Sequence, residues 1–382
     1  MSLELLQPVA AEVLSGLALH PPQVLGKNIQ IHTEATGFPE LNEARIAVVG
    51  VAEIRNSYFE QAHFDAAAFR KAWYALYPGN WQLGIADLGD LPNGASVEDT
   101  YQALNDICLH LRQINIIPVV IGGSHDLIYP LYRSFEKTHQ LVNIVSVDNQ
   151  FDFSQEEELI SGRSYMSRII MEQPNYLHNY TNLGYQSYLI AQEELDLMDK
   201  LFFESYRLGS FADDVTITEP LLRDADIVSV DMKVLAASAS GNFQTGAPNG
   251  IDGRILCALS RYAGLSDRLS IFGVFELQQT PLFFKLLAQA IWYFIEGVSQ
   301  RFDEYPVLTS QGFKKYTVTL SDFELFFFQS EKSQRWWINV SNENYIDNKT
   351  ASSTLLSCTP EDYHLACKDI LPERWWKAMK RV

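Results

Sequence analysis

The chain alternates short, continuous apolar runs with longer segments in which apolar residues recur at helical spacing. The continuous runs are rich in Val, Ile and Leu, which is typical of strands covered on both faces of a sheet. They predict strands at 45–51, 82–87, 116–121, 142–148, 187–191, 226–231 and 269–276. Helices are predicted between them at 62–77, 97–113, 127–137, 192–203, 251–263 and 281–298. This alternation favours an α/β fold: a three-layer α/β/α domain with a mainly parallel sheet of about eight strands.

The pattern changes near residue 300. Aromatic and β-branched residues mark three further strands at 316–320, 323–329 and 336–340, and Thr359-Pro360-Glu361 predicts the start of a last helix. We therefore divide the chain into an N-terminal segment (1–44), the α/β/α domain (45–298) and a C-terminal β-rich extension (299–382). Aromatic clusters of this kind usually pack an appendage onto its own domain, so we expect the extension to pack there.

The balance of charges limits the partners. Of the 382 residues, 47 are Asp or Glu and 29 are Lys or Arg, which gives a net charge of −18. An acidic surface repels phosphate backbones and anionic headgroups, so we expect no nucleic acid and no membrane partner. We also expect no segment with the roughly 20 apolar residues that a membrane helix needs.

Cysteine usage and the N-terminus indicate the compartment. The four cysteines form no C-x-x-C pair, which fits reduced thiols better than a disulfide framework or a zinc ribbon. The apolar stretch 9–19 is interrupted by Glu12 and predicts an amphipathic helix rather than a secretion signal. We therefore expect a cytoplasmic protein.

Several predicted strands run directly into polar residues. The carboxyl ends of parallel strands form the ligand crevice of open α/β sheets, so such residues are expected to meet there. A single Asp in this position is more often a helix cap. Four strand ends that together carry a His, three Asp and a Glu favour a shared site instead, formed by His125, Asp148, Asp152, Asp231 and Glu276.

The order of these motifs resembles that of the ureohydrolases, the family of arginase, agmatinase and formimidoylglutamase. I-G-G-S-H-D at 121–126 is similar to the family's G-G-D-H-S, D-N-Q-F-D at 148–152 to D-A-H-x-D, and S-V-D-M-K at 229–233 to S-x-D-x-D. T-G-A-P-N-G at 245–250, F-E-L at 275–277 and D-L-G-D at 87–90 also resemble family elements. The resemblance covers about residues 45–298 and implies the family's fold.

In the family, two manganese ions activate a hydroxide that attacks a guanidinium or amidine carbon. The resemblance makes His125, Asp148, Asp152 and Asp231 the ligands of the first ion, and all four residue types are present. The positions that belong only to the second ion carry Gln150 in place of His and Lys233 in place of Asp. An amide oxygen is a poor ligand, and an ammonium cannot bind a cation.

Counting charges limits the metal content. Three carboxylates would be neutralised by one divalent ion together with Lys233, whereas two ions would leave a surplus of positive charge. We therefore expect at most one divalent metal, manganese first, or none. Without metal, the Lys233 ammonium should lie within hydrogen-bonding reach of Asp148 or Asp231.

The residues that the resemblance assigns to substrate are also changed. Tyr165 stands where the family has its proton-shuttle His, and a phenol with a pKa near 10 is poorly matched to that task. Arg163 replaces an Asn that contacts substrate, while Glu276, which matches the residue that pairs with the guanidinium, is retained. The candidate catalytic residues are thus Glu276 and Tyr165, with Arg163 as a substrate-binding candidate.

Two functional hypotheses follow. The first is a degenerate family member, a pseudoenzyme without arginase, agmatinase or formimidoylglutamase activity that has a binding or regulatory role. The alternative is a formimidoylglutamase-like hydrolase that uses a single metal to cleave a linear amidine, a guanidine or another C–N bond. A relation to the histone deacetylases is a third reading, but their paired-His motif is not visible. A small-molecule ligand is expected in either of the first two cases, and a homo-oligomer is left open.

Overall fold

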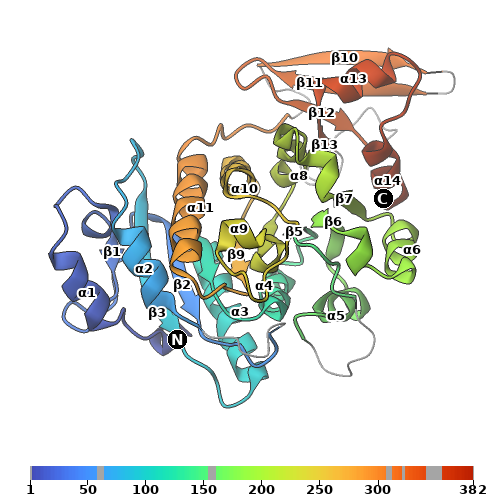
Figure 1. Ribbon diagram of the computed structural model, residues 1–382. Coiled ribbons are helices and arrows are strands. Elements are labelled where there is room, and N and C mark those ends of the chain that lie inside the picture. Colours follow the sequence, from blue (N-terminus) through green and yellow to red (C-terminus); the bar gives the residue numbers. More distant parts are fainter. Residues whose placement is uncertain are drawn as a thin grey trace.

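The computed structural model describes residues 2–57, 64–153, 161–306, 312–320, 323–340 and 355–381. Within these ranges nine strands form one sheet in which every pairing is parallel (Figure 1). In spatial order they are β1 (Gln30–Ile31), β3 (Gly84–Leu91), β2 (Ala44–Val51), β4 (Ile117–Ile121), β9 (Ile271–Phe275), β8 (Ile227–Asp231), β5 (Val142–Val147), β6 (Leu177–Tyr185) and β7 (Glu204–Arg207). The predicted fold class is confirmed.

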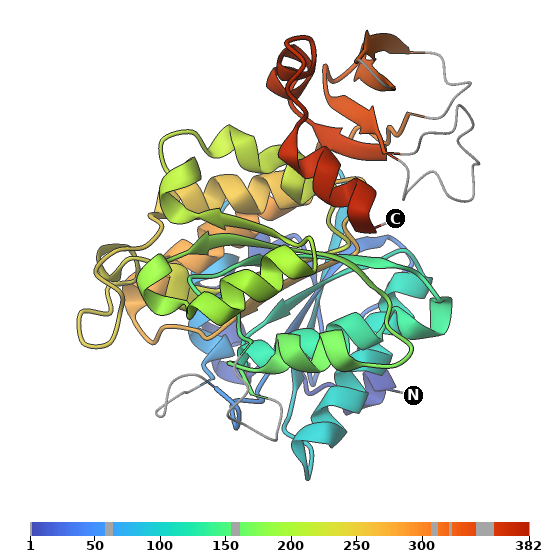
Figure 2. The same ribbon diagram turned by 90° about the vertical axis from the view of Figure 1, so that its right-hand side faces the viewer.

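Helices cover both faces of this sheet (Figure 2). One face carries α1 (Ala11–Ala18), α2 (Ala66–Tyr74), α8 (Glu219–Arg223), α10 (Gly253–Leu265) and α11 (Pro281–Ser299). The other carries α3 (Val97–Gln113), α4 (Ile128–Arg133), α5 (Tyr165–Met171) and α6 (Gln192–Lys200). Two short helices, α7 (Leu208–Phe211) and α9 (Ala237–Ser240), lie in connections. Successive residues of β2 enter opposite cores, as the strand period of two requires: Ile46 and Val48 pack on one side, Ala47 and Val49 on the other.

By length and composition alone, α11 is apolar enough to cross a membrane, contrary to our expectation from the sequence. The core helix of a globular protein passes the same test. Side chains of α11 such as Phe283, Leu287 and Phe294 are buried in the core together with α10 and the sheet. The apolar character of α11 is therefore explained by its place in the core.

Most predicted elements form close to their expected bounds, with one clear error. Residues 187–191 were predicted to form a strand, but the strand is β6, which ends at Tyr185, and Ser187–Leu189 form a short 3-10 turn. β6 escaped detection because polar residues interrupt its apolar pattern. Asn179 and Asn182 are buried there, and their side-chain N–H groups donate to Glu204 and to the Gln150 carbonyl. The first residues of the predicted helix 62–77 lie outside the described residues.

The D-L-G-D element forms a buried ion-pair network. Nε and Nη2 of Arg70 in α2 donate to the two oxygens of Asp87 at 2.8 and 2.9 Å, and Nη1 donates to both oxygens of Asp90 at 2.8 Å. The Tyr74 hydroxyl and the Gly89 N–H also donate to Asp87, at 2.8 and 3.0 Å. Every carboxylate oxygen of the pair thus has a donor, and the network fastens α2 to β3.

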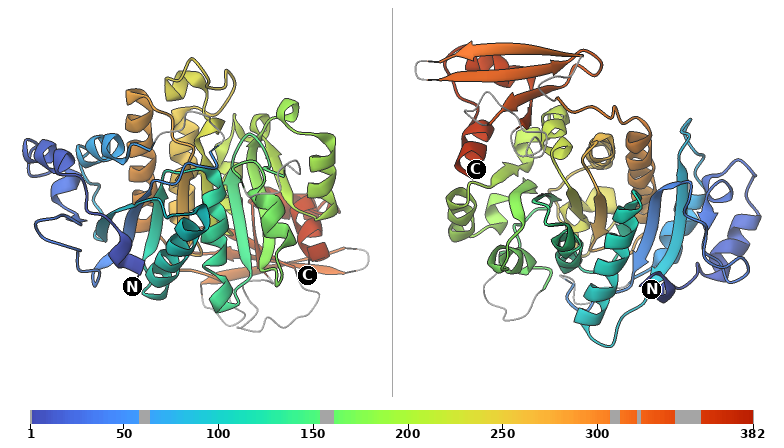
Figure 3. Two further views of the ribbon diagram at one scale, coloured as in Figure 1. Left: turned by 90° about the horizontal axis from the view of Figure 1, so that it is seen from below. Right: turned by 180° about the vertical axis from the view of Figure 1, so that it is seen from behind.

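The described C-terminal ranges form a second, antiparallel sheet. Its strands are β10 (Phe313–Thr319), β11 (Glu324–Ser330), β12 (Trp336–Asn339) and β13 (Leu355–Cys358), followed by α13 (Pro360–Ala366) and α14 (Glu373–Arg381). Figure 3 shows this unit at one end of the large sheet, with the red α14 turned toward it. The aromatic side chains of the unit pack largely among themselves around Phe327, Trp336 and Trp375.

Ion pairs hold α14 beside β7, the edge strand of the large sheet. Nε of Arg374 donates to Glu204 at 2.7 Å, its Nη2 donates to Asp224 at 2.9 Å, and Arg381 also pairs with Glu204. Burial alone would raise the pKa of Glu204, but the two guanidinium groups outweigh burial and hold that pKa below its usual value.

Candidate functional site

The polar residues singled out in the sequence lie at the carboxyl ends of four central strands. β4, β9, β8 and β5 are neighbours in the sheet. His125 opens the turn after β4, Glu276 follows β9, Asp231 ends β8, and Asp148 follows β5, with Asp152 four residues further on. Because the strands are parallel, these positions meet at one edge of the sheet.

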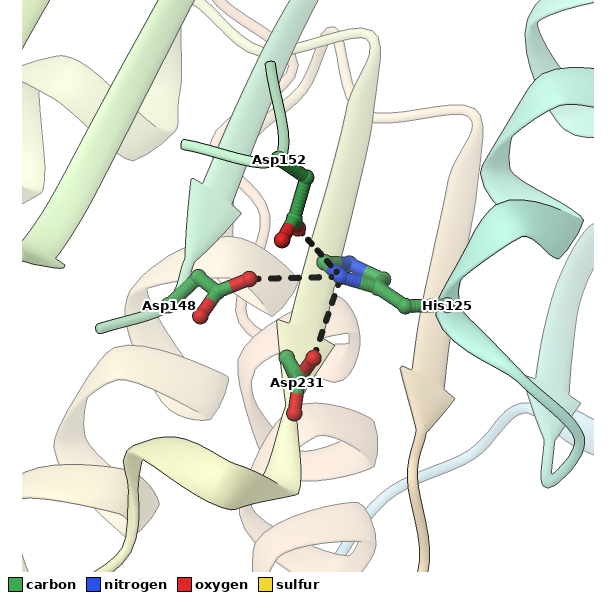
Figure 4. Close-up of side chains that lie close together, drawn as sticks. All are labelled: His125, Asp148, Asp152 and Asp231. Atoms are coloured by element: carbon green, nitrogen blue, oxygen red, sulfur yellow. Dashed lines mark hydrogen bonds and ion pairs between the residues drawn. The ribbon is translucent and has the colours of Figure 1, made fainter. Parts of the chain in front are cut away.

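Four of these side chains form a compact buried group (Figure 4). Nδ1 of His125 lies 3.3 Å from Asp148 Oδ2, 3.2 Å from Asp152 Oδ2 and 3.2 Å from Asp231 Oδ2. Asp152 is 4% exposed and the other three side chains are inaccessible to solvent. In the described part of the chain this is the one group of His, Cys, Asp and Glu that could hold a metal ion.

Hydrogen bonds from backbone N–H groups fix the orientation of the Asp148 and Asp231 carboxylates. Asp148 Oδ1 accepts from the Gln150 N–H at 3.0 Å, and Asp231 Oδ1 accepts from the Lys233 N–H at 2.7 Å. The second oxygen of each, Oδ2, is buried without a geometrically sound hydrogen bond among the described residues and faces His125. Such oxygens are costly to bury unless a cation compensates them.

Lys233 supplies one such cation. Its Nζ lies 2.8 Å from Asp231 Oδ2 and 3.3 Å from both Asp148 Oδ2 and Asp152 Oδ1, and the residue is 6% exposed. The ammonium therefore lies where charge counting places it. It contacts two of the carboxylate oxygens that also face His125.

Burial and neighbouring charges act against each other on the pKa values of these residues, and the outcome differs from residue to residue. Burial alone would lower the pKa of His125 and of Lys233, but the surrounding carboxylates outweigh burial and raise both pKa values well above normal. Burial, reinforced by Asp152, raises the pKa of Asp148 far above its usual value. Burial also opposes ionisation of Asp152, yet Lys233 and His125 hold the pKa of Asp152 below normal. Asp148 is therefore far more easily protonated than Asp152.

The donor set fits a divalent metal ion. An ion bound at about 2.0–2.2 Å to each ligand separates neighbouring ligand atoms by about 2.8–3.6 Å, for angles between octahedral and tetrahedral. The distances of 3.2–3.3 Å from His125 Nδ1 to the three carboxylates lie in that range. Imidazole nitrogen with carboxylate oxygens is a donor set suited to manganese or zinc.

Glu276 lies beside this group and is held from two sides. Its Oε1 accepts from the His125 backbone N–H at 3.2 Å, and its Oε2 accepts from the Ser57 hydroxyl at 2.5 Å. Glu276 and Asp152 both have left-handed backbone, with φ of 53° and 58°. This conformation is rare for residues other than glycine and clusters at functional sites. Ser57 belongs to no motif, and sequence reasoning missed it.

The far side of His125 contacts two hydroxyl groups. Nε2 lies 2.6 Å from the Ser229 hydroxyl and 3.4 Å from the Tyr165 hydroxyl. The Tyr165 ring is fully buried and meets the imidazole edge-on, with 4.8 Å between ring centroids. Burial raises the pKa of Tyr165 well above its ordinary value. Ser229 lies within the S-V-D segment, so the motif itself carried a signal for it.

Two predicted site residues lie differently. The Gln150 side-chain amide donates to the Leu189 carbonyl at 3.5 Å, so this residue contributes its backbone N–H to the acidic group rather than its amide oxygen. Arg163 is exposed in the turn before α5, where its backbone N–H donates to Ser161 Oγ at 3.2 Å.

Known proteins match both the sequence and the fold. A model of the arginase family matches residues 44–279. A formimidoylglutamase from Geobacillus sp. (strain WCH70) is 26% identical over 239 residues, which cover 59% of this chain and 72% of that protein.

Among solved structures, formiminoglutamase from Trypanosoma cruzi with Mn²⁺ superposes with a TM-score of 0.60 at 16% identity, covering 69% of this chain and 96% of that one. The agmatine ureohydrolase of Thermoplasma volcanium gives a TM-score of 0.57 at 18% identity, covering 75% and 97%. At these identities the structural likeness establishes the fold.

Proposed function

The chain belongs to the arginase family, and we propose that it is a hydrolase of non-peptide C–N bonds that works with one divalent ion. The observation that carries this proposal is the buried group of His125, Asp148, Asp152 and Asp231, whose oxygens and nitrogen converge on one point. The similarity to a formimidoylglutamase supports a linear amidine, such as a formimidoyl amino acid, as the substrate class.

Lys233 is the reason for proposing one ion rather than two. Its ammonium contacts all three carboxylates of the group. One divalent ion and one ammonium neutralise three carboxylates, whereas a second ion close to Lys233 would be repelled. The ion would be held by His125, Asp148, Asp152 and Asp231, and Lys233 would balance the remaining charge.

A bound divalent ion would supply Lewis-acid polarisation and lower the pKa of a water molecule. The chain's own residues do the rest. Glu276 is fixed by Ser57 and the His125 backbone, so its carboxylate is oriented in advance to accept N–H groups of an amidinium. Arg163 is exposed and cationic, and would attract a substrate that carries a carboxylate.

Elemental analysis and a substrate panel test this proposal together. Protein purified without chelators should contain about one equivalent of manganese or zinc. With Mn²⁺ it should release formamide, ammonia or urea from one of formimidoylglutamate, agmatine or arginine, and Asp231→Asn should abolish that release. Metal-loaded protein that turns over none of these linear substrates would contradict it.

A non-catalytic role is the second candidate, and one observation favours it. Without an ion, the Lys233 ammonium and a protonated His125 leave about one of the three carboxylate charges uncompensated, and the Tyr165 hydroxyl is turned onto His125. In that case the protein would bind its ligand without hydrolysing it. Purified protein free of metal, which also takes up no Mn²⁺ on dialysis, would favour this role.

A further inference from the structure

His125 has two ring nitrogens in two different surroundings. Nδ1 faces three carboxylates at 3.2–3.3 Å, and Nε2 faces the hydroxyls of Ser229 and Tyr165 at 2.6 and 3.4 Å. We propose that Ser229 and Tyr165 form a hydroxyl clamp that orients His125 for metal binding, so that Tyr165 is a positioning residue rather than a proton shuttle.

The fold places the Ser229 and Tyr165 hydroxyls on the same face of the sheet as Asp231. Ser229 precedes Asp231 by two residues in β8, so both side chains point to the same face of the sheet. Tyr165 is the first residue of α5, which covers that same face. The edge-on contact at 4.8 Å leaves the imidazole little room to rotate away from the carboxylates.

The chemistry of the imidazole gives the clamp its purpose. A ring nitrogen binds a metal only through its lone pair, and a hydrogen bond from the other nitrogen fixes which one carries the proton. With the proton on Nε2, the Ser229 hydroxyl accepts across the 2.6 Å contact, and the Nδ1 lone pair would be left for an ion. Tyr165 adds a weaker contact and fixes the plane of the ring.

The same face of the sheet provides matched controls. Ser146 of β5 pairs in register with Ser229 and is equally buried, and Tyr180 of β6 is a buried tyrosine like Tyr165. Neither hydroxyl contacts a ring nitrogen of His125; the Ser146 hydroxyl lies beside those of Tyr165 and Tyr180 instead. Ser146→Ala and Tyr180→Phe therefore remove the same atoms from the same layer without touching His125.

The test is calorimetric titration of Mn²⁺ into the full chain and its variants. We expect Ser229→Ala to weaken binding by about 10- to 100-fold, the usual effect of removing a partner of a ligating His, and Tyr165→Phe to weaken it by a few-fold. Ser229→Thr, which keeps a hydroxyl, should restore most of the affinity. Ser146→Ala and Tyr180→Phe, which remove no contact to His125, should weaken binding less than Ser229→Ala and Tyr165→Phe do. Equal losses in Ser229→Ala and Ser146→Ala would overturn the clamp.

A second readout separates this inference from the proposed function on which it rests. In metal-free protein labelled with ¹⁵N-histidine, solvent exchange of the His125 Nε2–H should be about tenfold faster in Ser229→Ala than in Ser146→Ala, because a bond from a charged donor is lost. If the natural protein binds no Mn²⁺, the single-metal hydrolase fails while this exchange experiment still decides the clamp. Unchanged exchange in Ser229→Ala would refute it.

Discussion

Two of the buried acidic groups in the described residues are compensated in different ways. Around Arg70, every oxygen of Asp87 and Asp90 accepts a well-formed hydrogen bond, largely from one guanidinium. Around His125, the Oδ2 atoms of Asp148 and Asp231 have no well-formed hydrogen bond among the described residues. These two oxygens are compensated only by nearby charge: they lie 3.2–3.3 Å from Nδ1 of His125 and 2.8–3.3 Å from Nζ of Lys233.

The difference separates a structural group from a binding group. A guanidinium is planar and carries several N–H donors, so one arginine can donate to both oxygens of two carboxylates. Those oxygens are then not free to bind a metal ion. A lysine ammonium is a point charge that compensates without saturating the oxygens. Both acidic groups stand out in the sequence, but of the two only the group around His125 keeps buried oxygens without well-formed hydrogen bonds, which could hold an ion.

The largest effect is expected from removing the guanidinium. Arg70→Met leaves the buried Asp87 and the partly buried Asp90 without their cation and should lower the free energy of unfolding by about 3–5 kcal/mol in urea titrations. Lys71→Met, the next residue of α2, removes an exposed ion pair with Glu12 and should change stability by less than about 1 kcal/mol. Mn²⁺ should not reduce the difference between Arg70→Met and the natural protein. A metal-dependent rescue would erase the distinction between the two groups.

Removing the ammonium should have a smaller effect that metal reverses. Lys233→Met leaves His125 in place, and Asp148 can take up a proton, so we expect a loss of about 2–3 kcal/mol in metal-free urea titrations. Saturating Mn²⁺, at 100 times its dissociation constant, should return about 2.7 kcal/mol through binding to the folded state. Lys315→Met, an exposed lysine of β10, is the control. A loss that Mn²⁺ leaves untouched would mean that Lys233 is structural, as Arg70 is.

Rebuilding the family's ligands should change the number of ions bound. Lys233→Asp with Gln150→His replaces a positive by a negative charge and adds an imidazole at position 150. Calorimetry should give two manganese ions for this double variant and at most one for the natural protein. Gln150→His alone should not bind a second ion, because Lys233 would still repel it. Tight binding of two ions by the natural protein would contradict the role given to Lys233.

The smallest effect concerns Glu204, another buried acid, which accepts hydrogen bonds from guanidinium groups as Asp87 does. Its folded-state pKa is depressed, so its stabilising contribution is full above the unfolded value of about 4.3 and is lost as pH falls through the folded value. Urea midpoints of the natural protein should therefore fall between about pH 5 and pH 3 more steeply than those of Glu204→Gln. Parallel curves for the two proteins would contradict the depressed pKa.

The central strands and the acidic group could be predicted from the sequence, because both follow from local patterns. β4, β5 and β8 are continuous apolar runs, and each leads directly into a site residue. The place of Lys233 followed from charge counting, since an ammonium next to three carboxylates has few alternatives.

The features that could not be predicted from the sequence depend on contacts between segments far apart in the chain. Nothing near Ser57 indicates that its hydroxyl holds Glu276, 219 residues away. β6 was missed because it buries two asparagines, whose side-chain N–H groups donate to acceptors outside the strand. The motif alignment placed Tyr165 at a shuttle position, but only the packing of α5 on the sheet shows that its hydroxyl points to His125.

The attachment of α14 to β7 also bears on which strands could add to the edge of the large sheet. β7 is the last strand of the large sheet, and the edge of a parallel sheet is a template on which another chain can add a strand. Lys377 and Arg381 of α14 donate to the Phe203 and Phe202 carbonyls immediately before β7, while Arg374 holds Glu204. The C-terminal helix thus covers the start of an otherwise open edge, and a chain shortened before Glu373 would expose that edge to aggregation.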